Sequence, residues 1–153
     1  MLERRYSVPA DHGAEFIAEV GFDPAFTVTI EHERAEAIAG PSGTRLFRKI
    51  SGGTISGRIE GTLYPDGAGE YSLLRPDGVA EIRTHVILNS SDGEWLYLYN
   101  MGYVRPDGYY RVTSWVDADV RGRHTWTAGL FFIGTGRLAA DGKSTTLTYF
   151  EVT

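Results

Sequence analysis

Alternation of apolar and polar residues is the dominant pattern of this chain, and it predicts β-strands. The longest example runs from Val79 to Leu88. One face of this run carries branched apolar side chains and Thr84, whereas the opposite face includes Arg83 and His85. The spacing therefore predicts a strand with one face suited to a core and one face suited to chemistry.

A second alternating run, Glu94–Met101, follows an Asn-Ser-Ser-Asp-Gly turn and has bulky residues on both faces. Leucines lie on one face, and the other face carries Trp95, Tyr97 and Tyr99. Two bulky faces are typical of a strand in a curved sheet that encloses something inside and is covered outside. We therefore expect this hairpin to form part of the wall of a ligand site.

Further strands are predicted along the chain, giving roughly eight to ten strands in a meander. They are Phe26–His32, Ala35–Ala39, Gly53–Tyr64, Tyr109–Val116, Trp126–Ile133 and Thr145–Val152. In Gly53–Tyr64, glycines alternate with branched residues on one face, which predicts a sharply coiled strand at a barrel corner. The one predicted helix is Asp11–Gly21, within an N-terminal extension over residues 1–25.

Glycine-rich turns and scarce helical periodicity place the chain in the all-β class. Five Asp-Gly pairs separate the predicted strands, and each is a strong hairpin signal because glycine adopts positive φ at little cost. An antiparallel up-and-down barrel is the expected architecture, because closure removes exposed strand edges. Residues 26–153 are expected to form this single barrel domain, with one substantial core.

Charge and composition argue against several classes of function. The net charge is −5 and there are two lysines, so the basic patch that nucleic-acid binding requires is missing. The chain has no cysteine, which removes disulfides and thiol catalysis and fits a cytoplasmic location. No apolar stretch reaches the length of a membrane helix, and the start lacks the apolar run of a secretory signal. Residue spacings match no metal site or nucleotide fingerprint, so no cofactor is expected.

Five segments carry a family resemblance. They are ISGGTISGRIEGTLYPDGAGEYSLLRPDG at Ile50–Gly78, then IRTHVIL, SSDGEWLYLYNMG and YYRVTSW, and finally TWTAGLFFIGTG at Thr125–Gly136. In order and spacing they resemble the domain-of-unknown-function 3237 family, an uncharacterised family of bacteria and fungi. The resemblance implies a calycin-like, lipocalin-like antiparallel barrel with a cavity. Members in natural-product pathways further imply cofactor-free ring closure, such as addition of a hydroxyl across an alkene.

The resemblance also implies particular site residues. The acid and the Trp of the family's Gly-Gly-Ala-Asp-Trp segment correspond to Glu70 and Tyr71, and its following Arg corresponds to Arg83. The remaining correspondences are Tyr109, Tyr110, Arg111 and Trp126. The chain departs from the pattern in its longer acid, in an extra residue before that acid, and in Ala128, where Asn is usual. These departures bear on the substrate and on the geometry of the site.

Glu70 and Arg83 form the leading catalytic hypothesis. If both face the barrel lumen, the guanidinium would anchor a carboxylate or enolate, and Glu70 would serve as general acid or base. His85 lies about 6.6 Å further along the strand face of Arg83 and would relay a proton near neutral pH. The alternatives are a structural ion pair at the rim and a histidine on an outward polar face.

Aromatic residues, together with Arg111, are the candidate substrate-binding groups. Six rings would stack on a planar ligand: Tyr71, Trp95, Tyr97, Tyr99, Tyr110 and Trp126. The alternative for each ring is ordinary core or barrel filling.

Two function hypotheses share this cavity. The first is a cofactor-independent cyclase, isomerase or lyase that acts by acid–base catalysis on a small hydrophobic oxygenated metabolite. The second is a lipocalin-like carrier that holds such a molecule without turnover. A third hypothesis is a solid-cored interaction domain. No nucleic acid or membrane partner is expected, and a homodimer would form through an outer face that carries Tyr103 or Trp115.

Overall fold

The structure, a computed structural model, describes residues 20–153 as antiparallel strands around one interior. The strands are β1 (Phe22–His32), β2 (Glu36–Gly40), β3 (Gly43–Gly57), β4 (Gly61–Leu74), β5 (Ala80–Ser90), β6 (Trp95–Val104), β7 (Tyr110–Ala118), β8 (Phe132–Leu138) and β9 (Ser144–Val152). A single turn of 3-10 helix, η2 (Thr125–Thr127), lies between β7 and β8.

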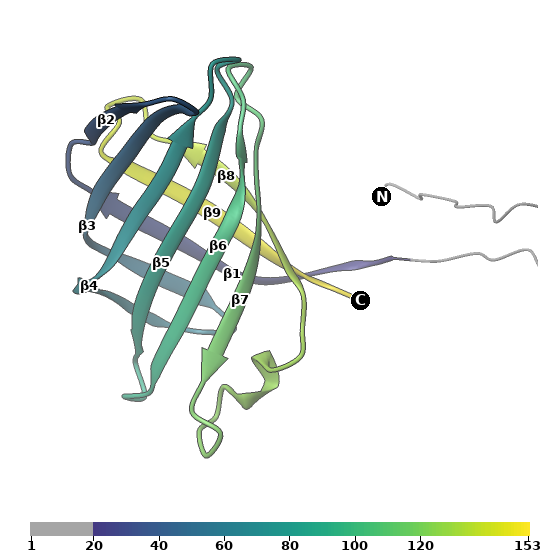
Figure 1. The fold of residues 1–153 in the computed structure, drawn as a ribbon. Helices are drawn as coiled ribbons and strands as arrows, with labels where there is room; N and C mark the ends of the chain where they lie inside the picture. The colour runs from purple at the N-terminus through teal and green to yellow at the C-terminus, as the bar shows by residue number, and fades with distance from the viewer. Residues whose placement is uncertain (1–19) are drawn as a thin grey trace, which may run out of the picture.

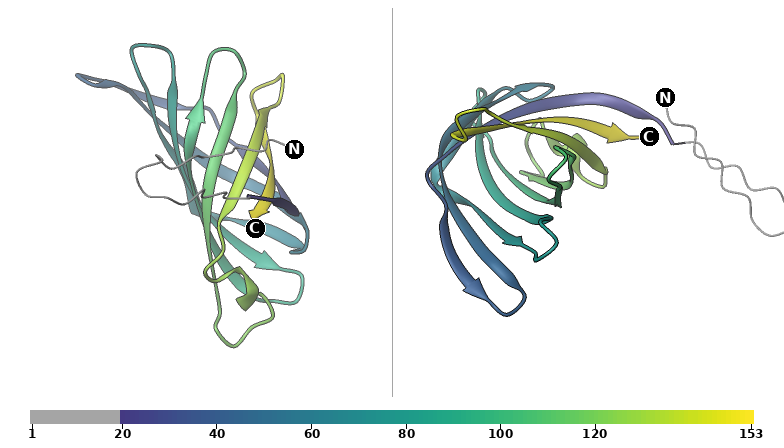
Figure 2. Two further views of the ribbon diagram at one scale, coloured as in Figure 1. Left: turned by 90° about the vertical axis from the view of Figure 1, so that its right-hand side faces the viewer. Right: turned by 90° about the horizontal axis from the view of Figure 1, so that it is seen from above.

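Eight of these strands close into a barrel. Strands β3 to β9 are neighbours in chain order, and β1 pairs with both β9 and β3. Within the described part of the chain, β2 pairs with β3 alone and extends that hairpin beside the barrel. Figure 1 shows the strands wound around a common interior, and Figure 2 shows the same curvature from two further sides. The expected closed antiparallel barrel is therefore confirmed.

Alternation along each strand decides which side chains enter the interior. In β5, Val86 and Leu88 are buried, whereas Arg83 is exposed. The same phase continues in β6, where Leu98 has no exposed surface. Burial of such a side chain contributes roughly 1.5–3 kcal/mol, and a one-residue slip in pairing would turn a whole row outward. The aliphatic residues therefore fix the register of the sheet.

The interior has two unlike ends. At the η2 end, Trp126 and Leu130 pack against the buried core, and the Trp126 and Phe132 ring centres lie 6.1 Å apart. The guanidinium carbon of Arg58 lies 5.0 Å from the Trp126 ring centre. The η2 end is at the bottom of Figure 1, where the 3-10 turn is drawn as a short coil. The opposite end, beside β2 and the turns at residues 75–79 and 105–109, holds the polar interior residues, and we call it the polar end.

The prediction of one coiled strand over Gly53–Tyr64 is wrong. β3 ends at Gly57 and β4 begins at Gly61, so the segment is a hairpin. Gly57 has a φ of 119°, and its amide donates to the Glu60 carboxylate at 3.0 Å, which closes the turn. A Cβ on Gly61 would lie 2.3 Å from the Asn89 carbonyl oxygen. The alternating glycines thus serve a tight turn and a close strand approach.

The prediction of a strand over Trp126–Ile133 is wrong in its first half. The Thr127 amide and hydroxyl both donate to the His124 carbonyl oxygen, at 3.1 and 2.9 Å, and form η2 instead. Gly129, at a φ of 77°, then turns the chain before β8 begins at Phe132. The apolar residues of this segment cap the barrel instead. A short apolar run in a sequence can form either a strand or such a cap, and periodicity alone does not separate the two.

The other predicted strands are present, with ends shifted by a few residues. The predicted helix Asp11–Gly21, up to residue 19, lies outside the described residues, as does most of the predicted extension over residues 1–25. The first described strand, β1, begins at Phe22. Among the described residues, none of the helical segments has the length and apolar character needed to cross a membrane.

Candidate functional site

A belt of polar side chains crosses the interior faces of five neighbouring strands at the polar end. Directly paired residues on neighbouring strands share a face. The register joins them in order from Arg48 through Glu70, Thr84 and Asn100 to Ser114. Thr84, Asn100 and Ser114 are buried, whereas Arg48 and Glu70 are half-buried. The belt therefore has a charged part that reaches solvent and an uncharged part that does not.

Asn100 connects the uncharged part of the belt. Its Oδ1 accepts hydrogen bonds from the Tyr149 hydroxyl at 2.8 Å and from the Ser114 hydroxyl. The Nδ2 atom of Asn100 and the Oγ atom of Ser72 are buried without a partner among the described residues. An unpaired buried polar atom costs about 1–3 kcal/mol, so these two atoms mark places for further hydrogen-bonding groups.

His32 faces the polar end from the last position of β1. The β1–β3 register shifts between Glu31 and His32, and the imidazole is buried. Its Nε2 lies 3.2 Å from the Thr145 hydroxyl, whereas Nδ1 is buried with no partner in residues 20–153. Burial, followed by the charge of Arg48, lowers the pKa of His32. The imidazole is therefore neutral at neutral pH and has a ring nitrogen free for a ligand.

Tyr110 faces the same end of the interior from the start of β7. Its ring packs over Gly136, where a Cβ atom would lie 2.6 Å from the ring. Burial, followed by the charge of Glu70, raises the pKa of the Tyr110 phenol, so the hydroxyl stays protonated and can donate. The charges of Arg48 and Glu70 act on both Tyr110 and His32. In the register, Arg48 pairs with Glu70, and His32 pairs with Ile50, two residues beyond Arg48 on β3. Tyr110 begins β7 at the same end, so we call these four residues the polar cluster.

The polar cluster offers the groups that proton chemistry requires. A guanidinium supplies a fixed positive charge, a carboxylate and a neutral imidazole accept protons, and a phenol donates one. Toward the η2 end the interior is filled by apolar side chains such as Leu88, Leu98 and Phe132. Among residues 20–153, no three His, Asp or Glu side chains gather as a metal-binding group. A molecule bound at the polar end would therefore meet polar groups near solvent, with packed apolar side chains beneath them.

The structure separates the residues of the leading catalytic hypothesis. Glu70 faces the interior, but Arg83 is exposed on the outer face of β5, so the prediction that they share one chamber is wrong. Glu70 pairs with the buried Thr84, and successive residues of a strand point to opposite faces, so Arg83 must point outward. His85 shares the outer face with Arg83, as their spacing predicts.

Most of the predicted ligand-binding groups also lie outside the barrel. Tyr110 faces the interior, and Trp126 covers the η2 end. The groups on the outer face are Tyr71, Trp95, Tyr97, Tyr99 and Arg111. There, His85 Nδ1 lies 2.6 Å from the Tyr97 hydroxyl, and the His85 and Tyr99 ring centres lie 4.6 Å apart. The predicted aromatic lining therefore forms an outer surface instead.

Sequence reasoning missed two members of the polar cluster, His32 and Arg48. His32 carries a usable signal, because it ends the alternating apolar row of the first predicted strand. Arg48 carries no comparable signal, because residues 43–52 show no regular apolar row and no strand is predicted there. Its interior position follows from its pairing with Glu70, which only the three-dimensional structure reveals.

Comparison with known proteins places the chain among its relatives. Residues 20–120 match the family model described as Protein of unknown function (DUF3237). The chain belongs to this family. A UPF0311 protein of Clostridium acetobutylicum is 28% identical to this DUF3237 chain over 102 residues, which are 64% of each protein. The chain thus matches somewhat less than two thirds of that relative's length.

Solved structures share the barrel of this DUF3237 chain. A beta-barrel like protein from Acinetobacter baumannii AYE matches with a TM-score of 0.80 at 17% identity, over 89% of this chain and 98% of that one. An enzyme from Penicillium herquei matches with a TM-score of 0.76 at 16% identity, over 92% of this chain and 99% of that one. At such identities the likeness establishes the fold alone.

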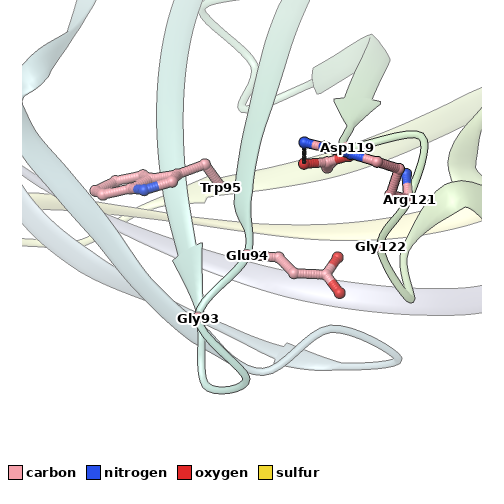
Figure 3. Close-up of a pocket in the computed structure, with 6 residues that line it drawn as sticks. All are labelled: Gly93, Glu94, Trp95, Asp119, Arg121 and Gly122. Carbon is pink, nitrogen blue, oxygen red and sulfur yellow. Dashed lines mark hydrogen bonds and ion pairs between the residues drawn. The ribbon is translucent and has the colours of Figure 1, made fainter.

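A separate pocket of this DUF3237 barrel lies at the outside of the η2 end, with a volume of about 500 Å³ (Figure 3). The Glu94 carboxylate points toward Gly122 and accepts a hydrogen bond from the Arg123 amide at 2.6 Å. Asp119 and Arg121 form an ion pair at 3.3 Å beside it. The hydrogen bond between Arg123 and Glu94 ties the β5–β6 turn to the loop after β7, and we interpret the pocket as a junction between loops.

Proposed function

We propose that the polar end of the barrel binds a small, hydrophobic, oxygenated molecule and catalyses a proton-transfer reaction on it without a cofactor. Ring closure, isomerisation and elimination all belong to this class. The observation that carries the proposal is the placement of Arg48, Glu70, His32 and Tyr110 at the polar end of an interior that is apolar toward its other end. His32 and Tyr110 are buried, and a low-polarity surrounding strengthens their hydrogen bonds to a ligand.

Each group has a role that follows from its charge and protonation. Arg48 would neutralise a carboxylate or a developing enolate, and the protonated Tyr110 hydroxyl would donate to the same oxygen. Glu70, or the unpaired Nδ1 of His32, would accept the proton that leaves a carbon or hydroxyl of the ligand. The acid formed would return that proton to another ligand atom, so the reaction needs no oxidant or reductant.

This assignment changes the expectation from the sequence. Glu70 keeps its role as the acid or base, whereas Arg48 and His32 take the places expected of Arg83 and His85. The resemblance of the barrel to an enzyme from Penicillium herquei supports a catalytic role. The calycin-like, lipocalin-like classification and a cytoplasmic location are part of the same proposal.

A carrier that binds such a molecule without turnover is the second candidate function. The unpaired buried polar atoms of Asn100 and Ser72 favour it, because they could hold the oxygen atoms of a bound molecule without any chemistry. The two functions differ in what Glu70 contributes. A carrier needs the charge of Arg48 for affinity, whereas an enzyme also needs a group that moves protons.

Proton exchange in heavy water tests the proposed function. Small ketones, phenols and unsaturated alcohols would be incubated with the protein and followed by NMR for deuterium incorporation or ring closure. We expect turnover of at least one compound, and a loss of at least about tenfold in rate for whichever of Glu70→Gln and His32→Gln removes the proton acceptor. Arg83→Met is the matched control and should keep the full rate.

The melting temperature of each variant separates lost chemistry from lost folding. Full activity of Glu70→Gln would remove Glu70 from the mechanism. Saturable binding of compounds that undergo no exchange would instead establish the carrier function.

A further inference from the structure

A row of rings crosses the outer face of β3–β7, the face turned toward the viewer in Figure 1. The row consists of Phe47, Tyr71, His85, Tyr99 and Trp115, and we call it the ring row. Its successive ring centres lie 5.1, 6.0, 4.6 and 5.7 Å apart. Tyr71 is 53% exposed and Trp115 is 43% exposed. Large, mutually packed rings therefore face solvent across five strands.

The surroundings of the ring row have the composition of a protein interface. Further exposed rings flank it at Trp95 and Tyr103, and Met101 lies beside Arg83 on the neighbouring strand. Protein interfaces are enriched in aromatic residues, Met and Arg, and they are depleted in Lys and Glu. Large contiguous apolar patches are rare on exposed surfaces, and where they occur they usually mark interaction sites.

Charged residues are sorted on the two sides of the ring row. Arg83 and Arg111 lie toward the polar end, whereas Asp66 and Asp117 lie toward the η2 end. All four are exposed, and within residues 20–153 none of them forms an ion pair. Glu81, the acid on the basic side, is paired with an arginine outside the row. These four unpaired charges are therefore positive on one side of the rings and negative on the other. Lys49, an exposed cation that lines the acidic side with Asp66, is paired with Glu33 at 3.8 Å.

A groove lies directly beside the ring row. It has a volume of about 680 Å³, and Tyr71, His85 and Tyr97 line it together with residues 65–69 of β4. The β4–β5 register is irregular between Tyr64 and Gly69, so this part of β4 bends out of the ladder. The face thus offers both protruding rings and a recess that could receive rings.

We propose that this face is the interface of a homodimer, in which a two-fold axis runs across the strands along the ring row. Such an axis lays the ring row of one copy on that of the other. It also turns the basic side of each copy onto the acidic side of its mate, with Arg83 against Asp66 and Arg111 against Asp117. Two-fold pairing requires a self-complementary surface, and the sorted charges supply one. This inference is independent of the reaction proposed at the polar end.

Sedimentation velocity between about 1 and 100 µM protein tests the interface. We expect the wild type to become dimeric over this range. Trp115→Glu and Tyr71→Glu should weaken dimerisation by at least about a hundredfold, because each buries a charge among rings. Val120→Glu and Phe131→Glu are matched controls, since both residues are exposed and apolar but lie in loops outside this face, and both variants should dimerise like the wild type.

Circular dichroism confirms that each variant keeps its sheet content. A wild type that stays monomeric at about 100 µM would overturn the proposal. Face variants that dimerise as well as the controls would also overturn it.

Charge exchange tests the direction of the axis. Arg83→Asp and Asp66→Arg should each weaken the dimer by about tenfold, because each places like charges opposite one another. The double variant should restore wild-type association, since the opposite charges then face each other again. A double variant that remains as weak as either single variant would contradict the two-fold arrangement.

Discussion

The inner and outer faces of β3–β7 differ in a way that reverses a common expectation. Aromatic rings lie mostly outside, in the ring row, whereas aliphatic side chains and the polar belt lie inside. Leu98 and Tyr99 are neighbours in β6, yet the first is fully buried and the second faces outward. The comparison shows that ring content alone does not identify the lumen of a barrel.

Two different requirements explain this difference. In the narrow interior of the eight-stranded barrel, β1, β8 and β9 contribute one packed group of rings, with the Phe26 ring centre 5.3 Å from that of Phe132 and 5.0 Å from that of Tyr149. The inner faces of β3–β7 supply mainly compact side chains that fit around this group. The outer face has no such limit, so rings can stack there across strands. The inner polar belt then supplies the proposed chemistry, and the outer rings supply the proposed contact.

Truncation of two neighbouring residues in β6 to alanine should give the largest change in the free energy of unfolding. Leu98→Ala removes a fully buried side chain and should lower the free energy of unfolding by about 2–5 kcal/mol. Tyr99→Ala removes outer stacking contacts and should lower it by only about 1 kcal/mol. Urea denaturation measures both values. Equal losses would contradict the assignment of the two faces.

Removal of the Asn100 side chain should have the next largest effect. Asn100→Ala leaves the Tyr149 and Ser114 hydroxyls without their acceptor and should lower the free energy of unfolding by about 1–3 kcal/mol. Tyr149→Phe removes one donor while keeping the ring, so its cost should be smaller. Denaturation of both variants tests the belt, and a neutral Asn100→Ala would show that it adds no stability.

The pH dependence of stability should distinguish the inner histidine from the outer one. Burial lowers the pKa of His32 in the folded state, so the unfolded chain binds its proton first as the pH falls. Stability from this residue is therefore present above its unfolded pKa of about 6.5 and is lost as the pH falls below that value. Thermal melts would be recorded between pH 5 and 8, at intervals of about half a pH unit. The melting temperature should fall less toward acid pH for His32→Gln than for His85→Gln.

Removal of the outer guanidinium, that of Arg83, should have the smallest effect on stability. Arg83 is exposed, so Arg83→Ala should change the free energy of unfolding by no more than about 0.5 kcal/mol. Thermal denaturation at low protein concentration, where association is weak, is the appropriate measurement. A loss of several times this size would assign Arg83 a structural role that its exposure does not suggest.

The alternation of residues predicts most strands and the closed barrel, because a strand buried on one face carries a period of two. It also predicts that Arg83 and His85 share a face. In Val79–Leu88 the pattern identifies the core face correctly, because Val86 and Leu88 are buried, whereas in Glu94–Met101 both faces are bulky and the pattern does not show which one lies inside. That choice depends on packing across several strands, as in the pairing of Glu70 with Thr84.

The candidate site is only partly predictable for a related reason. Glu70 and Tyr110 are expected in the site and lie in the interior. Arg48 joins them because it pairs across strands with Glu70, which lies 22 positions later in the chain. The local pattern of apolar and polar residues carries no information on such pairing. The hairpin inside Gly53–Tyr64 shows the same limit, since its turn depends on a side chain bonding to the backbone.

The most direct test of the central claim compares the two guanidinium groups. An NMR titration with 2-naphthoate, a small apolar carboxylate, would follow wild type, Arg48→Met and Arg83→Met. The account predicts saturable shifts around Thr84 and Tyr110, a loss of affinity of at least about tenfold in Arg48→Met, and unchanged affinity in Arg83→Met. Shifts confined to the outer face, affinity lost in Arg83→Met alone, or no saturable binding would contradict it.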